Sequence, residues 1–471
     1  MMIPTAVVAA QYAGMFEYFE TSRIDARANQ PPPVVQPSPS VPQQDKIALA
    51  ADASLSPVAR LRVTDRRWEY TLSYSPTFTV TDIELPISAK PVVLNAGAVS
   101  AAWHDRRVRV MLSEAGSYGW ENLAYLYGTP VAGQPLAAGQ SQAPGQTVGQ
   151  MGQATAPTSG QTLGVTGTAP IKPTYLFPFG SSTTTASMQL RATRSVTVAL
   201  SGGYSLSGNL SNSTEGALVY PEQFGPSGYA SVAYASSPID SFITLASAQE
   251  ITTPMGVCLT PAGQILAASA GAATPTCRNV APLLLLEETA RHRLSSNATL
   301  SAGLGVSASV YQLTSEEVWG VLPVGGVALT ERFGPPPQGR DQLEPSGVRL
   351  SADLSPTVNI FTGTPSNRLQ ISASLVTHVA RNVVLSFVAG ALQTVPLPRP
   401  DPSPLTLLNG GVDARVRLTS LISVSAGVQA LWETQQNVGV LPLAASATPT
   451  GTTTTEVGYV ALIVRAPRLR F

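Results

Sequence analysis

The chain has 471 residues, and its 28 basic and 28 acidic side chains give a formal net charge of zero. This balance provides no electrostatic basis for binding a nucleic acid. Only 12% of the residues are charged, yet no stretch supplies the roughly 20 consecutive apolar residues of a transmembrane helix. The best candidate, residues 382–398, is interrupted by Ser386, Gly390 and Pro396. A nucleic-acid-binding protein and a helical membrane protein are therefore both disfavoured.

The N-terminal region differs in composition from the rest of the chain. Residues 1–10 form a short apolar run ending in small residues, like the end of a secretory signal peptide cleaved after Ala10. A disordered N-terminus is the alternative. The proline-rich stretch 31–42 is typical of a stiff, polyproline-like linker. We therefore predict a signal-peptide remnant over 1–10 and a periplasmic arm over 11–57, with one short helix over 15–27.

The remainder of the chain, residues 58–471, alternates apolar and polar residues with a period of two. Leu300, Leu304 and Val306, for example, alternate with Ser301 and Ser307. Successive side chains of a β-strand point to opposite faces, so each such segment has one apolar and one polar surface. The pattern predicts an all-β region.

Three features favour a transmembrane barrel over a soluble β-sandwich, which would also alternate. The alternating segments are about 10–14 residues long, which suits a tilted membrane crossing. Their polar face is rich in Ser, Thr, Gly, Arg and Gln instead of Lys and Glu. Short turns also alternate with long loops, as in bacterial outer-membrane barrels. We therefore predict a closed antiparallel transmembrane β-barrel of about 16 strands, or alternatively about 14, with short periplasmic turns and long external loops.

The predicted strands follow one another along the chain in antiparallel order. They cover 66–80, 95–104, 106–118, 182–192, 195–207, 226–236, 239–251, 281–293, 296–312, 321–333, 346–356, 367–379, 383–394, 405–417, 421–434 and 455–471. The region 121–180 is predicted to be a flexible, low-complexity external loop, because it is uncharged from Asn122 to Ile171 and carries repeated Gly-Gln dipeptides. A constriction loop folded into the pore is the alternative.

The C-terminal residues point to the same architecture. The chain ends Arg-Leu-Arg-Phe, with Phe471 terminal and Leu469 two residues before it. This ending resembles the terminal strand of Gram-negative outer-membrane β-barrel proteins, in which a final aromatic residue is read by the barrel-assembly machinery. The resemblance implies that the protein lies in the outer membrane, where its partners are the lipid bilayer and the assembly machinery. It also implies that Leu469 and Phe471 form the assembly signal. A bulge near Pro467 is expected, since Val464 and Leu469 are out of phase.

If the apolar phase faces lipid, the alternate phase lines the lumen, where water or opposite charges solvate charged groups. The predicted lumen-lining residues are Glu69, Arg109, Gln189, Arg191, Arg349, Asp353, Gln370, Asp413, Arg415, Arg417, Gln429 and Glu433. They would either set solute preference or only brace the barrel wall.

The remaining chemistry-bearing residues are few. Cys258 and Cys277 are predicted to form a loop disulfide, with two free thiols as the alternative. No metal or cofactor is predicted, because metal sites need more ligands at closer spacing. An enzyme is disfavoured, since His104, His292 and His378 all fall at or beside predicted inner turns and neither a GxSxG nor an HExxH motif is present.

The barrel prediction leads to a functional one. We expect a porin-like channel for small solutes, with a non-conducting structural or adhesive surface barrel that acts through its external loops as the alternative. A homo-oligomer or an unidentified surface partner is compatible with either.

Overall fold

The computed structural model describes most of the barrel wall. The described residues are 13–30, 48–81, 90–122, 176–210, 222–258, 276–313, 316–333, 346–358, 365–395, 405–435, 451–466 and 469–470. Within them, no helix has the length and hydropathy needed to cross a membrane.

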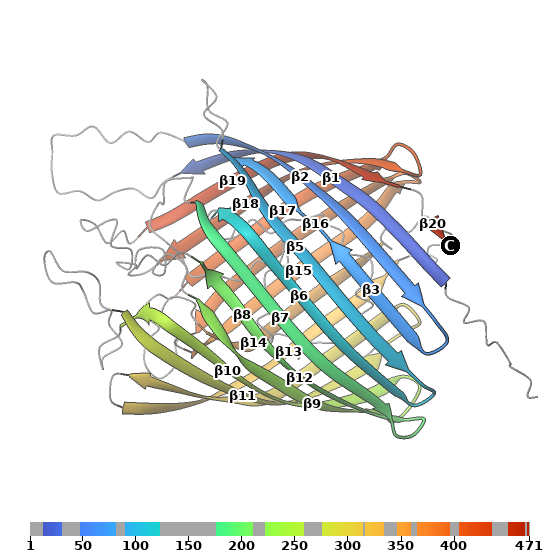
Figure 1. The fold of residues 1–471 in the computed structure, drawn as a ribbon, viewed down its shortest axis with the longest axis vertical. Coiled ribbons are helices and arrows are strands. Elements are labelled where there is room, and N and C mark those ends of the chain that lie inside the picture. Colours follow the sequence, from blue (N-terminus) through green and yellow to red (C-terminus); the bar gives the residue numbers. More distant parts are fainter. Residues whose placement is uncertain are drawn as a thin grey trace, which may run out of the picture.

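The described residues form one large antiparallel sheet closed into a barrel (Figure 1). Its strands are β1 Ala13–Gln30, β2 Ala48–Thr64, β3 Trp68–Tyr74, β4 Thr77–Thr81, β5 Lys90–His104, β6 Val108–Asn122, β7 Leu176–Arg191, β8 Val196–Asn209, β9 Gln223–Ala235, β10 Asp240–Val257, β11 Thr276–Arg293, β12 Ala298–Leu313, β13 Glu316–Arg332, β14 Gly347–Val358, β15 Pro365–Ala380, β16 Val383–Val395, β17 Leu405–Arg417, β18 Ile422–Gln435, β19 Gly451–Arg465 and β20 Leu469–Arg470. Because β3 and β4 pair with the same neighbours and β20 continues β19 along β1, the barrel has eighteen crossings.

The barrel closes between β1 and β19, which pair from Phe19↔Arg465 to Gln30↔Thr454. This pairing corrects the sequence prediction of about 16 strands, which began the barrel near residue 66. The described parts of the predicted periplasmic arm are strands β1 and β2, and the expected helix over 15–27 lies within β1. The predicted signal-peptide remnant, residues 1–10, lies outside the described residues.

Short turns connect the strands at one end of the barrel, at the right of Figure 1. Four of these turns share one device, in which a hydroxyl oxygen accepts hydrogen bonds from two backbone N–H groups that follow it. The four hydroxyls belong to Thr193, Ser237, Ser295 and Thr419. Such side-chain acceptors satisfy turn N–H groups that the ladder leaves open.

The two faces of the wall differ as the alternation predicts. Leu304 is 75% exposed on the outer face, whereas Ser301 and Ser307, on the other phase of β12, are buried. In hydrocarbon no water is available for open backbone groups, so closure of the sheet is required if this face meets lipid.

Exposed aromatic side chains lie towards both ends of the outer face. Trp68 and Tyr70 lie stacked at the short-turn end of β3, with ring centroids 5.9 Å apart. Tyr118 and Trp120 are exposed towards the other end of β6. Two aromatic belts of this kind are typical of the two membrane–water interfaces of a transmembrane barrel.

The predicted bulge near the C-terminus is confirmed by the pairing of β1. Phe19 pairs with Arg465 and Phe16 with Leu469, so the C-terminal strand holds one more residue than β1 between these pairs. The extra residue returns Leu469 to the outer face, where it is 60% exposed. Phe471 lies outside the described residues.

Candidate functional site: the lumen wall

Eleven of the twelve predicted lumen-lining residues occupy the inward phase of their strands. On each described strand these positions alternate with the exposed apolar residues, as Asp353 does with Leu350 and Arg109 with Val110. These lumen-lining residues differ in burial according to their position along the barrel axis. Asp353, Asp413 and Gln429 are buried in the wall. Glu433 is placed only by the β18 register, opposite Leu407 and Thr453.

All five predicted arginines lie at the short-turn end of the barrel, each within three residues of the end of its strand. Arg109, Arg191 and Arg349 are exposed there, and Arg415 and Arg417 are half-buried. We call these five residues the mouth arginines. They place five guanidinium groups at this mouth of the lumen.

Glu69, at the same end, is held by a basic partner that the sequence analysis did not select. A guanidinium nitrogen of Arg62 on β2 lies 3.0 Å from a carboxylate oxygen of Glu69 on β3. Both groups remain partly exposed, so this pair is worth about 1 kcal/mol or less.

On β6 to β8 the lumen face above the mouth is largely uncharged. Hydroxyl pairs link neighbouring strands there: Ser113 with Thr185 and Ser117 with Ser181, each at 2.6 Å. These small hydroxyl side chains hydrogen-bond across the ladder and take up little space on the inner face. This side of the wall is polar without carrying charge.

The opposite side, β11 to β19, carries two charged groups on the inward phase that the sequence analysis did not select: Glu287, which is buried, and Arg368, which is half-buried. The predicted residue Asp413 accepts a hydrogen bond from the Tyr459 hydroxyl. Glu287 shares its phase with buried Thr289, whereas Glu288 is exposed on the outer face. The phase of β11 could have identified Glu287, but the adjacent Glu288 obscured it.

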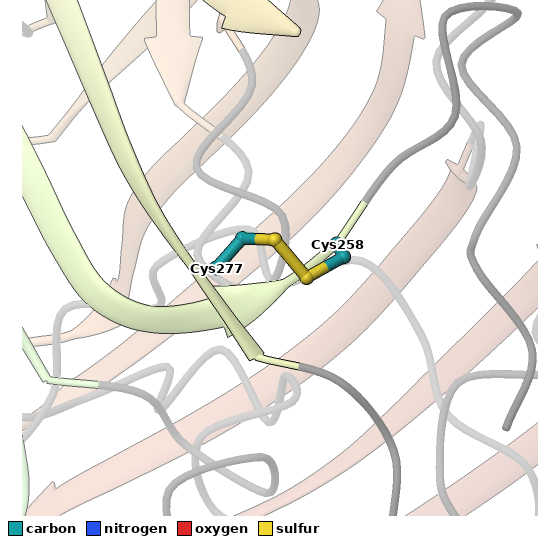
Figure 2. The surroundings of a disulfide bond; sticks show 2 residues. All are labelled: Cys258 and Cys277. Atoms are coloured by element: carbon teal, nitrogen blue, oxygen red, sulfur yellow. A yellow bond between two sulfur atoms is a disulfide. The ribbon is translucent and has the colours of Figure 1, made fainter. Parts of the chain in front are cut away.

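The two cysteines form the predicted disulfide at the long-loop end of the β10–β11 hairpin (Figure 2). The Cα atoms of Cys258 and Cys277 are 5.0 Å apart. The bond closes the connection 259–275 at its base, which restricts that connection in the unfolded chain as well.

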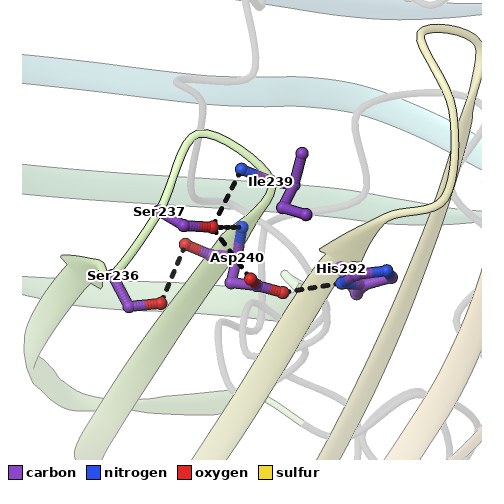
Figure 3. A network of polar contacts seen from close by, with 5 residues as sticks. All are labelled: Ser236, Ser237, Ile239, Asp240 and His292. Atoms are coloured by element: carbon purple, nitrogen blue, oxygen red, sulfur yellow. Dashed lines mark hydrogen bonds and ion pairs between the residues drawn. The ribbon is translucent and has the colours of Figure 1, made fainter.

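A serine, an aspartate and a histidine meet at the β9–β10 turn, but in an order that does not activate the serine (Figure 3). The Ser237 hydroxyl donates to Asp240 at 2.8 Å, and Asp240 also contacts His292 Nδ1 at 2.6 Å. A nucleophilic serine would instead contact the histidine. The cluster therefore ties β10 to β11 at the turn.

A second hydroxyl–imidazole contact joins Ser346, which precedes β14, to His378 of β15. Ser346 Oγ lies 2.7 Å from His378 Nδ1 and also accepts a hydrogen bond from the His378 backbone N–H. Because Ser346 Oγ is hydrogen-bonded to the backbone of β15 as well as to the imidazole, the contact is suited to fixing the end of the β14–β15 pair.

Comparisons with known proteins find likeness in structure alone. No protein-family model and no curated protein sequence matches the chain. Among solved structures, the chain resembles the copper transporter OprC (9% identity, TM-score 0.44, 94% of this chain and 80% of that one). It also resembles the FrpB iron transporter from Neisseria meningitidis in its apoprotein form (6%, 0.46, 95% and 81%) and the siderophore receptor PiuA from Acinetobacter baumannii (9%, 0.40, 94% and 81%). The metals and siderophore named here belong to those proteins.

The class of the chain follows from its own geometry. The barrel closes on itself, presents apolar side chains outward between two aromatic belts and turns hydroxyl and charged groups inward. Only a closed barrel satisfies all strand hydrogen bonds within a bilayer. The chain therefore has the architecture of an outer-membrane β-barrel protein.

Proposed function

We propose that the protein forms a water-filled, porin-like channel for small solutes across the outer membrane. The observation that carries this proposal is the closed wall of eighteen crossings with a polar inner face. Barrels of about 16–18 strands are wide enough for an aqueous channel, unlike barrels of about eight strands, whose side chains fill the interior. The lumen-lining residues, including the mouth arginines, would set which solutes pass.

The test is conductance of the purified full chain in planar lipid bilayers. A steady open current is expected, and Ser201→Trp, which adds a large side chain to the inward phase of β8, should reduce it. Leu200→Trp, on the exposed outer face of the same strand, is the matched control and should leave the current unchanged. Silent bilayers, or equal effects of the two variants, would contradict the channel.

A non-conducting surface barrel is the second candidate. The Cys258–Cys277 disulfide favours it, since the bond fixes the base of a long connection that could present a binding surface. In that case the protein conducts no current in planar bilayers. Loss of the disulfide should then weaken adhesion of cells without changing membrane permeability.

We also propose that Leu469 and Phe471 form the signal read by the barrel-assembly machinery. The exposed position of Leu469 on the outer face supports this role. Phe471→Ala should lower the amount of folded barrel in the membrane, whereas Arg470→Ala should have little effect.

A further inference from the structure

One cross-strand row on the lumen wall has no side chains at its centre. The register places Thr289 of β11 opposite Gly303 of β12, Gly303 opposite Gly326 of β13, and Gly326 opposite Asp353 of β14. All four positions are on the inward phase. Two adjacent glycines therefore form a bare floor between two polar residues.

Two carboxylates occupy the space above this floor. A Cβ atom on Gly303 would lie 2.3 Å from Glu287 Oε1, and one on Gly326 would lie 3.0 Å from Asp353 Oδ1. Each carboxylate thus leans over a different glycine. Directly opposed Cα atoms in an antiparallel pair are about 4.5–5.5 Å apart, so Glu287 and Asp353 reach towards each other.

The backbone of β13 is also adapted to this close approach. Gly325, next to the floor, has a φ of +150°, a conformation that residues with a side chain rarely adopt. A Cβ there would lie 2.3 Å from the carbonyl oxygen of Gly303. Glycine at this position lets β12 and β13 pass close together beneath the two carboxylates.

Both carboxylates are buried, and their negative charge is only partly balanced. Glu287 is 5% exposed and accepts a hydrogen bond from the Thr289 hydroxyl at 3.3 Å. Asp353 is 8% exposed and has a side-chain hydrogen bond with Ser355, but its Oδ2 atom is buried without a hydrogen-bond donor among the described residues. Asp353 interacts with the positive charge of Arg368 and with the negative charge of Glu287. The positive charge of Arg368 thus acts on Asp353, and the Glu287 carboxylate adds a second negative charge beside it.

In the charged form, a buried carboxylate oxygen without a partner beside a second carboxylate is unfavourable, and a cation bound between the two would stabilise both charges. We propose that Glu287 and Asp353 bind a divalent cation of the calcium type above the Gly303–Gly326 floor. The inference rests on the proposed channel, because the cation would reach this site from the water in the lumen. Carboxylate and hydroxyl oxygens are the ligands that such hard cations prefer.

The composition of the site also sets its expected strength. Glu287, Asp353 and the Thr289 hydroxyl supply protein oxygens, and water completes the coordination. The described residues contain no group of three or more His, Cys, Asp or Glu side chains arranged for a metal ion. With only two carboxylates, the site belongs with weak calcium sites, for which dissociation constants are about 10⁻⁴–10⁻³ M. Ca²⁺ tolerates irregular, one-sided coordination better than Mg²⁺, which demands an octahedron.

The test is calorimetric titration of the detergent-solubilised full chain with CaCl₂, with MgCl₂ for comparison. Saturable Ca²⁺ binding is expected, weakened about tenfold or more by Glu287→Gln and by Asp353→Asn, since each removes one of two charged ligands. Gly303→Ala should also weaken binding, because its Cβ would displace the Glu287 carboxylate while both charges remain. Gly458→Ala, whose Cβ would meet nothing within 4 Å, is the matched control and should bind as the unmodified chain does.

Heat-dependent gel mobility reports whether each variant is folded. No saturable Ca²⁺ binding by the unmodified chain would overturn the site, as would unchanged binding by a folded Gly303→Ala variant. Tighter binding of Mg²⁺ than of Ca²⁺ would also overturn the assignment. Bilayer conductance separates the two proposals: a silent barrel that binds Ca²⁺ contradicts the channel alone, and a conducting barrel that does not bind it contradicts the site alone.

Discussion

Leu304 and Ser301 stand three residues apart on β12 and face opposite sides of the barrel wall. Leu304→Arg should reduce the yield of folded barrel, because an arginine on the lipid face near the bilayer midplane costs about 2–4 kcal/mol. Ser301→Arg should fold nearly as well as the unmodified chain, since its charge would lie in the lumen. Heat-dependent gel mobility of both variants in detergent checks this. Equal folding of the two would show that the facing of β12 is wrong.

At the residue scale, the alternation of apolar and polar residues predicts which face of the barrel wall a side chain occupies. It does not predict which side chains of different strands lie close together. It placed Asp353 on the inward phase, where the structure has it, because alternation requires only knowledge of the strand. The approach of Glu287 to Asp353 depends instead on the registers of β11 to β14, which bring Gly303 and Gly326 between them. The register between strands cannot be predicted from a single sequence. Gly303 and Gly326 therefore appear in the sequence only as small residues.

At the element scale, the closing pair of strands was the main feature missed. All sixteen predicted segments are strands, since long and clean alternation is a strong signal. In β1 the signal is weak, because Glu17, Glu20 and Ser22 put polar residues on both phases. β2 alternates more clearly, with Leu55 and Leu61 on the outer phase, but the proline-rich stretch before it suggested a linker.

The β1–β19 closure can be tested by disulfide cross-linking. Ser22 pairs with Leu462, and paired Cα atoms at about 4.5–5.5 Å are within the range for a disulfide. The double variant Ser22→Cys with Leu462→Cys should therefore cross-link in the folded barrel, as detected by mass spectrometry of the linked peptides. Ser22→Cys with Val428→Cys, on the next strand, should not. A free N-terminal arm would give no preference between the two pairs.

For the whole molecule, the placement of the short turns on the periplasmic side remains a prediction. Cysteines introduced at Arg194 and Ser420, in short turns, should be protected from an impermeant thiol reagent on intact cells. Cysteines at Leu210 and Glu222, at the opposite end, should react. The native cysteines are joined in a disulfide and should not contribute. The reverse labelling pattern would invert the orientation of the barrel.

The mouth arginines have an electrical consequence. They concentrate anions at one end of the lumen, whereas the connection at the other end from Asn122 to Ile171 is uncharged. A channel with unequal ends rectifies, so its current should differ between the two polarities of applied voltage. The asymmetry should be strong at 0.01 M salt, where the Debye length is about 30 Å, and disappear at 1 M, where it is about 3 Å. Current–voltage curves of singly inserted barrels should show this, and Arg109→Gln with Arg191→Gln should make the curves more symmetric.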